Sequence, residues 1–108
     1  MSAHPQAVQP VSVKLEGELT IYRANELKPV LLAALDGAAD VHFDLAGVSE
    51  IDTAGVQLLL LVRREAATRG LRLRLSSPSA AVRGAFELLE LTAQLHGANL
   101  AEPVLASA

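Results

Sequence analysis

The chain has 108 residues, of which 51% are hydrophobic, 3% aromatic and 19% charged, and its formal net charge is −3. A chain of this length favours one domain, and its apolar content excludes disorder along its whole length. The absence of cysteine excludes a disulfide framework, a thiolate metal site and a cysteine nucleophile, and the negative charge gives no electrostatic footprint for nucleic acid as a partner.

The two ends of the chain differ from the rest. Residues 1–10 contain two prolines without periodicity and predict a flexible N-terminal arm, residues 11–105 form the predicted domain, and residues 106–108 form a short tail. The first residues lack a basic flank followed by an apolar stretch, so we expect no signal peptide. No apolar run approaches the roughly 20 residues that span a bilayer. We therefore expect a cytoplasmic protein with no direct membrane insertion.

The apolar residues alternate between a period of two, typical of strands, and a period of 3.6, typical of helices. The first period predicts a strand over residues 11–15 and a second over residues 19–22, joined by a tight turn. Helical spacing then continues over residues 27–35 and ends at Gly37. Alternation returns over residues 41–45, where we expect a third strand.

The second half of the chain continues this order of elements. A loop is predicted over residues 46–51, then a helix over residues 54–69 that ends at a glycine, then a fourth strand over residues 71–75. In Ser77-Pro78, a hydroxyl N-cap before a first-turn proline predicts a third helix. The apolar stripe of this helix contains Val82, Ala85, Phe86 and Leu89. No element is assigned after it.

Every predicted strand keeps one polar face. In a doubly wound parallel sheet, helices cover both faces and the strands are apolar throughout, so this alternation predicts helices mainly on one face. We therefore expect an α/β, two-layer fold with about four strands in a mixed sheet. The uncovered face is expected to carry polar residues, mostly of opposite sign, that are able to pair across strands: Lys14, Glu16, Thr20, His42, Asp44, Arg72 and Arg74.

The sequence contains no catalytic motif. None of the three histidines has a serine or an acid at a spacing that suggests a catalytic triad, and no glycine-rich phosphate loop is present. Asp40, His42 and Asp44 share one strand face and form the best arrangement for a metal, but exposed alternation accounts for the same residues. We expect no enzymatic activity, no cofactor and no metal.

The most distinctive segment is Asp-Leu-Ala-Gly-Val-Ser-Glu-Ile-Asp-Thr-Ala-Gly-Val, residues 44–56. It places Asp52 and Thr53 at the N-terminus of the second predicted helix, and Gly55 leaves the first turn sterically open. Backbone N–H groups without intrahelical partners and the helix dipole favour a side-chain oxygen or a phosphate at that end. Thr53 is therefore a candidate helix cap and also a candidate phosphorylation site.

The helix after this segment has two distinct faces. At 100° per residue, its core face gathers Gly55, Leu59, Val62 and Ala66. Its accessible side gathers a hydroxyl, two leucines and two polar groups, namely Thr53, Gln57, Leu60, Leu61 and Arg64. Such a stripe suits a protein partner, and the alternative is that one of the leucines packs against the C-terminal segment.

The order of elements, together with Asp-Leu-Ala-Gly-Val followed by Ile-Asp-Thr-Ala-Gly-Val, resembles a STAS domain, the fold of bacterial anti-sigma factor antagonists. The resemblance covers residues 11–95. It implies a non-enzymatic signalling module that regulates transcription. In such antagonists a motif hydroxyl is phosphorylated by a serine/threonine kinase that is also the anti-sigma factor, and the unmodified form binds that partner and frees the sigma factor.

Carried over residue by residue, Asp52 matches the motif aspartate, Thr53 the first hydroxyl and Gly55 the glycine. Ala54 stands where many antagonists have a second hydroxyl, so either Thr53 takes the phosphate or the switch is absent. The partner-binding surface implied by the resemblance contains Asp52, Thr53, Ala54, Gly55, Gln57, Leu60, Leu61 and Arg64.

Two other settings remain open for the same motif. It resembles the STAS subunit of the bacterial phospholipid ABC transporter, which docks on the ATPase subunit through this helix edge. It also resembles domains that accompany chemotaxis-type histidine kinases. The sequence does not distinguish these settings, and it names neither the partner nor the oligomeric state.

Overall fold

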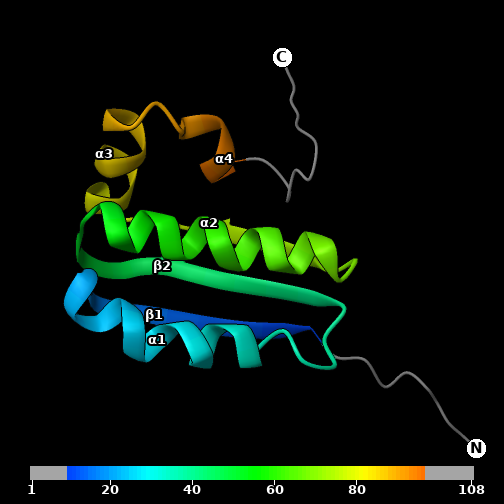
Figure 1. The fold of residues 1–108 in the computed structure, drawn as a ribbon. Coiled ribbons are helices and arrows are strands. Elements are labelled where there is room, and N and C mark those ends of the chain that lie inside the picture. Colours follow the sequence, from blue (N-terminus) through cyan, green and yellow to red (C-terminus); the bar gives the residue numbers. More distant parts are fainter. Residues whose placement is uncertain (1–9, 97–108) are drawn as a thin grey trace, which may run out of the picture.

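The computed structural model describes residues 10–96, which form a three-stranded sheet packed against helices (Figure 1). The elements follow in the order β1 (Val11–Leu19), α1 (Ile21–Ala33), β2 (Asp40–Ile51), α2 (Thr53–Thr68), β3 (Arg72–Ser76), α3 (Ala80–Leu88) and α4 (Thr92–His96). The predicted arm, apart from Pro10, and the predicted tail at residues 106–108 lie outside the described residues. None of the helices in the described part is long and apolar enough to cross a membrane.

The α/β fold class is confirmed, and within residues 10–96 the sheet differs from the prediction in its number of strands and in their relative direction. The strands of the described part lie in the order β1-β2-β3, and both pairings are parallel, whereas we predicted about four strands in a mixed sheet. The difference arises at residues 19–22, because β1 ends at Leu19 and α1 begins at Ile21. Four residues are too few to distinguish a strand from the first turn of a helix by periodicity.

The tight turn predicted after residue 15 is absent, and Gly17 lies inside β1. Gly17 has a φ of +82°, a conformation that L side chains rarely adopt. The register between β1 and β2 shifts on either side of it, which lets β1 continue to Leu19. Arg23 of α1 holds this irregular stretch, because its Nη1 donates to the carbonyl oxygens of Glu16 and Glu18 at 2.9 and 2.6 Å.

β2 is longer than the sequence pattern indicated. Residues 46–51, predicted as a loop, continue the strand and pair with the second half of β1, with Gly47 beside Glu16 and Ile51 beside Leu19. The carboxyl ends of β1 and β2 therefore meet at one edge of the sheet. This edge is where α1 and α2 both begin.

One face of the sheet is buried under the helices, as the alternation predicted. The buried strand residues are Leu15, Leu19, Val41, Phe43, Leu45, Val48, Leu73 and Leu75. Figure 1 shows α1 and α2 side by side over the sheet, starting at the same end. The apolar side chains that complete the core from the helices include Leu31, Leu59, Val62, Ala66, Val82, Phe86 and Leu95.

The other face of the sheet carries the expected polar residues except for Thr20, which is the N-cap of α1. Lys14 lies opposite Asp44 in the register, and Asp40 lies opposite Arg72. The ion pair observed on this face is between Lys14 Nζ and Glu16 Oε2 at 3.8 Å. It is exposed to solvent, so its contribution to stability is small.

The N-cap of α3 lies two residues after the predicted position. Ser79, rather than Ser77, is the N-cap, and its Oγ accepts a hydrogen bond from the N–H of Val82 at 3.2 Å. Pro78 therefore precedes the cap instead of following it. Ser77 adopts a φ of +51°, a left-handed conformation that turns the chain from β3 toward α3.

Candidate functional site

Asp52 lies between the N-termini of α1 and α2. Its Oδ1 accepts from the backbone N–H of Gly55 at 3.0 Å, and its Oδ2 accepts from the N–H of Ile21 at 3.0 Å. Thr20, the N-cap of α1, makes no side-chain cap hydrogen bond, so one carboxylate caps both helices. The bonds from Ile21 and Gly55 lower the pKa of Asp52, because they stabilise its charged form.

Gly55 is required by the packing of α2 against the end of β1. A Cβ at this position would lie 2.0 Å from the carbonyl oxygen of Leu19 and 2.9 Å from Cγ1 of Ile51. The first turn of α2 therefore lies directly against the backbone of β1, and a side chain does not fit between them. Gly55 is buried and does not offer a surface to a partner.

Thr53 is the first residue of α2 and is exposed. It is not the helix cap that the sequence allowed, because Asp52 takes this position and binds the N–H of Gly55. The carboxylate of Asp52 thus already occupies the N-terminus of α2, which the sequence suggested as a place for a phosphate. The motif is therefore divided between two residues that maintain the fold, Asp52 and Gly55, and one whose side chain faces solvent.

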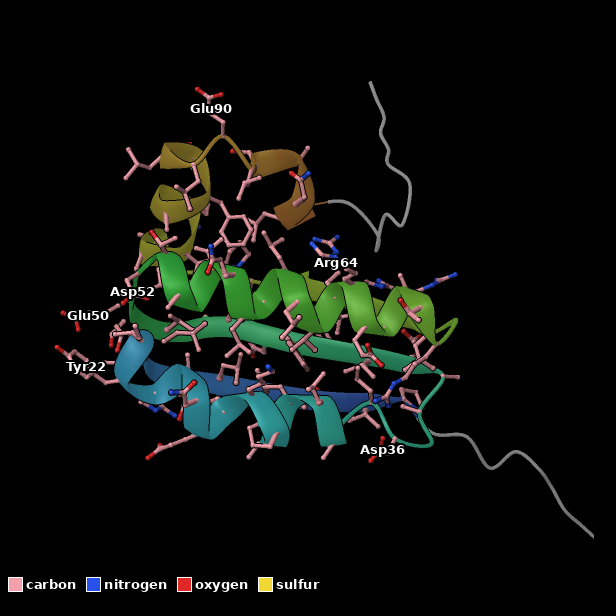
Figure 2. The ribbon with its side chains drawn as sticks, viewed as in Figure 1. Tyr22, Asp36, Glu50, Asp52, Arg64 and Glu90 are labelled. Carbon is pink, nitrogen blue, oxygen red and sulfur yellow. The ribbon has the colours of Figure 1, made fainter. Side chains whose placement is uncertain are left out.

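Acidic residues lie at the carboxyl ends of β1 and β2, just before α1 and α2 begin. Glu18 and Glu50 lie directly opposite each other in the β1–β2 register, which is an unfavourable arrangement for like charges. Asp52 lies two residues beyond Glu50, and Figure 2 shows Glu50 and Asp52 at the same end of the molecule. The hydroxyl of Thr20 donates to Glu18 at 3.3 Å. A negative group at Thr53 would therefore directly follow the Asp52 carboxylate in the chain, at the end of the molecule that also carries Glu50 (Figure 2).

Two exposed apolar residues beside this motif were not found from the sequence. Ile21 and Tyr22, in the first turn of α1, are 59% and 85% exposed, and Ile21 is joined to Asp52 by the hydrogen bond described above. Figure 2 shows Tyr22 at the same end as Asp52. The sequence pattern assigned both residues to a strand. Thr20 could have indicated that a helix begins at residue 21, because threonine is favoured at an N-cap.

The other residues predicted to bind a partner lie along α2 with different exposure. Gln57 and Arg64 are exposed, whereas Ala54, Leu60 and Leu61 are half-buried. Leu60 and Leu61 pack partly against the core and also line a groove of about 430 Å³ between α1 and α2. The α1 side of this groove is formed by Ala24, Asn25 and Lys28.

Two of the three residues considered for a metal are hydrogen-bonded to other groups. His42 Nε2 is hydrogen-bonded to the hydroxyl of Ser76, and Asp44 Oδ1 accepts from the N–H of Ala46 at 3.0 Å. Asp40 lies opposite Arg72 in the sheet. Across residues 10–96, no group of three or more histidines and acids is arranged to hold a metal ion.

Known proteins resemble this chain in sequence and in fold. A protein-family model described as "Mlab, STAS domain" matches residues 2–100. An anti-sigma-B factor antagonist of Staphylococcus epidermidis is 43% identical over 49 residues. This match spans 44% of the present chain and 45% of the relative, so it covers less than half of the relative's length.

Two solved structures share the fold. The unphosphorylated anti-sigma factor antagonist SpoIIAA has a TM-score of 0.68 and 21% identity, with 94% of this chain and 85% of that chain covered. A sulfate transporter family protein from Wolinella succinogenes has a TM-score of 0.66 and 23% identity, with 83% and 75% covered. At these identities, the similarity shows a common fold.

Proposed function

Because the chain belongs to the STAS domain family, we propose that it is a non-enzymatic regulatory module of the anti-sigma factor antagonist type, switched by phosphorylation of Thr53. The observation that carries this proposal is the division of roles within the motif. Asp52 and Gly55 are engaged in joining β1, α1 and α2, whereas the side chain of Thr53 is exposed. A hydroxyl in this position is accessible to a kinase without local unfolding.

The proposed partner surface extends from Thr53 along the exposed sides of α1 and α2. Ile21 and Tyr22 contribute an exposed apolar area on α1, and Gln57 and Arg64 contribute polar groups on α2. Aromatic residues with arginine are frequent energetic centres of protein interfaces, which makes Tyr22 the proposed anchor. Leu60 and Leu61 extend the same surface into the groove between the helices.

Phosphorylation of Thr53 would add about −1.5 to −2 charge at neutral pH. Asp52 already accepts from the N–H of Gly55, and none of the residues 53–56 is basic, so a phosphate on Thr53 would lie next to a carboxylate without a basic side chain in this first turn. A partner that covers Thr53 would have to desolvate this charge next to the Asp52 carboxylate. Binding is thereby weakened while the fold is retained.

The proposed partner is a serine/threonine protein kinase that is also an anti-sigma factor. In this scheme the unmodified module binds the kinase and frees a sigma factor, and the kinase reverses the interaction by transferring phosphate from ATP to Thr53. The module itself needs no cofactor. Because such kinases use cellular ATP, we propose that the module acts in the cytoplasm.

Phosphate mapping by mass spectrometry tests this function directly. The protein is incubated with ATP and the kinase encoded near its gene, alongside Thr53→Ala and a matched control, Thr68→Ala, at the other end of α2. We expect a single phosphate on Thr53, lost in Thr53→Ala and retained in Thr68→Ala. Phosphate on Ser76, Ser77 or Ser79 with Thr53 unmodified would contradict the proposed switch.

A second function is favoured by Ala54, which leaves the motif with a single hydroxyl. In this alternative, the chain is a constitutive accessory subunit of a phospholipid-transport ABC ATPase and docks through the same edge of α2. It predicts stoichiometric co-purification with an ABC ATPase and an intact mass without phosphate. The anti-sigma factor proposal predicts a kinase as the co-purified protein and a phosphorylated fraction.

A further inference from the structure

The groove between α1 and α2 has an apolar floor and a positively charged rim. Leu58, Leu60 and Leu61 of α2 form most of the floor, and the charged side chains lining the groove are Lys28 of α1 and Arg64 of α2. Both cations are exposed, and among residues 10–96 neither takes part in an ion pair. A purely cationic rim is distinctive in a chain with a net charge of −3.

The two cations lie on opposite walls and are staggered along the groove. The Asp52 bridge places Ile21 and Thr53 at the same level, and both helices start at the same end (Figure 1). With a rise of about 1.5 Å per residue, Lys28 lies about 10 Å along α1 and Arg64 about 16 Å along α2. The axial offset of about 6 Å corresponds to roughly one helical turn.

We propose that this groove binds an acidic amphipathic helix of the protein partner. The apolar side of that helix would pack on Leu60 and Leu61, and carboxylates on its two flanks, one turn apart, would pair with Lys28 and Arg64. This inference rests on the proposed function, since it concerns the same partner surface. Beyond the proposed function, the inference assigns the α1 side of the groove to the partner surface and specifies the chemistry of the partner segment that binds there.

The geometry favours a helix over an anionic lipid. A single headgroup carries its charge at one position, whereas the groove presents two cations on opposite walls, offset by about one turn. A bound helix meets both cations at once. The space between two packed helices also has the elongated shape that a third helix fills.

Groove binding is largely independent of the Thr53 switch. Arg64 lies 11 residues after Thr53, which is about 16 Å along α2. This separation exceeds the Debye length of about 8 Å at physiological ionic strength, so a charge at Thr53 is mostly screened at Arg64. The isolated helical segment should therefore respond weakly to Thr53→Glu, whereas the whole partner should respond strongly.

A displayed library of helical peptides tests the proposed chemistry. Peptides of about 16 residues with randomised positions are selected on the full-length protein, and the enriched peptides are titrated by fluorescence polarisation. We expect enrichment of leucine or isoleucine at helical spacing with flanking Asp and Glu. In NMR spectra, the shifted amide signals should map to the groove, including those of Lys28, Gln57 and Arg64.

Charge reversal supplies the decisive comparison. The double variant Lys28→Glu/Arg64→Glu should weaken the selected peptides by about ten-fold or more, while Lys14→Glu/Arg74→Glu, on the exposed sheet face, should leave their affinity within about two-fold. Thermal melts monitor folding of both variants. No enriched pool, a pool without acidic residues, equal affinity for both double variants, or NMR shifts outside the groove would each overturn the proposal.

Two further measurements separate this proposal from the alternatives. The first is binding of the protein to anionic phospholipid vesicles. If the wild type binds vesicles, Lys28→Glu/Arg64→Glu does not, and no peptide is selected, then the groove binds lipid and the peptide site is overturned. The second is the affinity of the selected peptides for Thr53→Glu, which should differ from their affinity for the wild type by less than about three-fold. Peptide binding that survives while Thr53 proves to be unmodified by the kinase would support the groove and reject the phosphorylation switch.

Discussion

The carboxylate of Asp52 accepts a hydrogen bond from the backbone N–H of Ile21, 31 residues earlier in the chain, at 3.0 Å. This bond joins the first turn of α1 to the motif at the start of α2. It also holds the first turn of α1, which carries the exposed apolar residues Ile21 and Tyr22, at the same end of the molecule as Asp52 (Figure 2). Asp52 therefore positions the proposed partner surface through hydrogen bonds to the backbone of both helices, although its own carboxylate is occupied by these bonds.

Asp52→Asn should destabilise the protein near neutral pH. An amide presents one oxygen and one NH₂ group, so it cannot accept from both Ile21 and Gly55 in the way that the carboxylate does. We expect a melting temperature several degrees lower than that of the wild type near pH 7. Circular dichroism melts of both proteins provide the measurement.

The same pair of proteins should show a specific pH dependence. The pKa of Asp52 is lowered in the folded state from its ordinary value of 3.8, so its stabilising effect is present above that value. This stabilisation is lost as the pH falls through the lowered pKa. The difference between wild type and Asp52→Asn should therefore shrink at acidic pH, and a constant difference from neutral to strongly acidic pH would rule out this role for the carboxylate.

Gly55→Ala should strongly destabilise the fold, because the new Cβ would lie 2.0 Å from the carbonyl oxygen of Leu19. Such a backbone clash forces α2 away from β1, and we expect a loss of about 3 kcal/mol or more in the free energy of unfolding. The matched control is Gly84→Ala in α3, where a Cβ meets nothing within 4 Å. This control should gain about 0.5–1 kcal/mol from helix propensity, and equal effects in urea titrations would contradict the packing described here.

Ser79→Ala should cost about 1 kcal/mol, because Ser79 Oγ caps α3 through the N–H of Val82. Ser77→Ala should change the stability by less than about 0.5 kcal/mol, since Ser77 lies outside the helix and is exposed. Denaturant titrations of the two variants compare the capping position found in the structure with the one predicted from the sequence. A larger effect at Ser77 than at Ser79 would show that the helix begins earlier.

Tyr22→Ala should weaken partner binding without affecting the fold. Its side chain is 85% exposed, so the stability should change by less than about 0.5 kcal/mol. If Tyr22 anchors the interface, the affinity for the partner kinase should fall by about ten-fold or more. Leu88→Ala on α3, where the side chain is 83% exposed, is the matched control and should retain wild-type affinity in calorimetric titrations.

Much of the fold is predictable from periodicity in long segments. The 16-residue helix α2 was expected to bury Leu59, Val62 and Ala66, and all three are buried. The strand alternation placed the helices on one face of the sheet, and the structure confirms this arrangement. Periodicity failed over short stretches, at residues 19–22 and 46–51, where strand pairing and helix capping by distant residues determine the structure.

The site was only partly predictable for a related reason. The sequence identified Asp52, Thr53 and Gly55, but it could not show that Asp52 also caps α1, because this contact joins residues far apart in the chain. Arg63 of α2 is only 5% exposed, and burial lowers its pKa. A helical arginine between Val62 and Arg64 has no local signal that distinguishes a buried position from an exposed one.

The most direct test compares the affinity of the purified partner kinase for the unmodified protein and for the protein phosphorylated at Thr53. Isothermal titration calorimetry with a non-hydrolysable ATP analogue keeps each form unchanged during the measurement, and Thr68→Glu serves as a charge control at the far end of α2. The proposed switch predicts that the phosphate weakens binding by about ten-fold or more, while Thr68→Glu binds like the wild type. Equal affinities of the phosphorylated and unmodified proteins would contradict it.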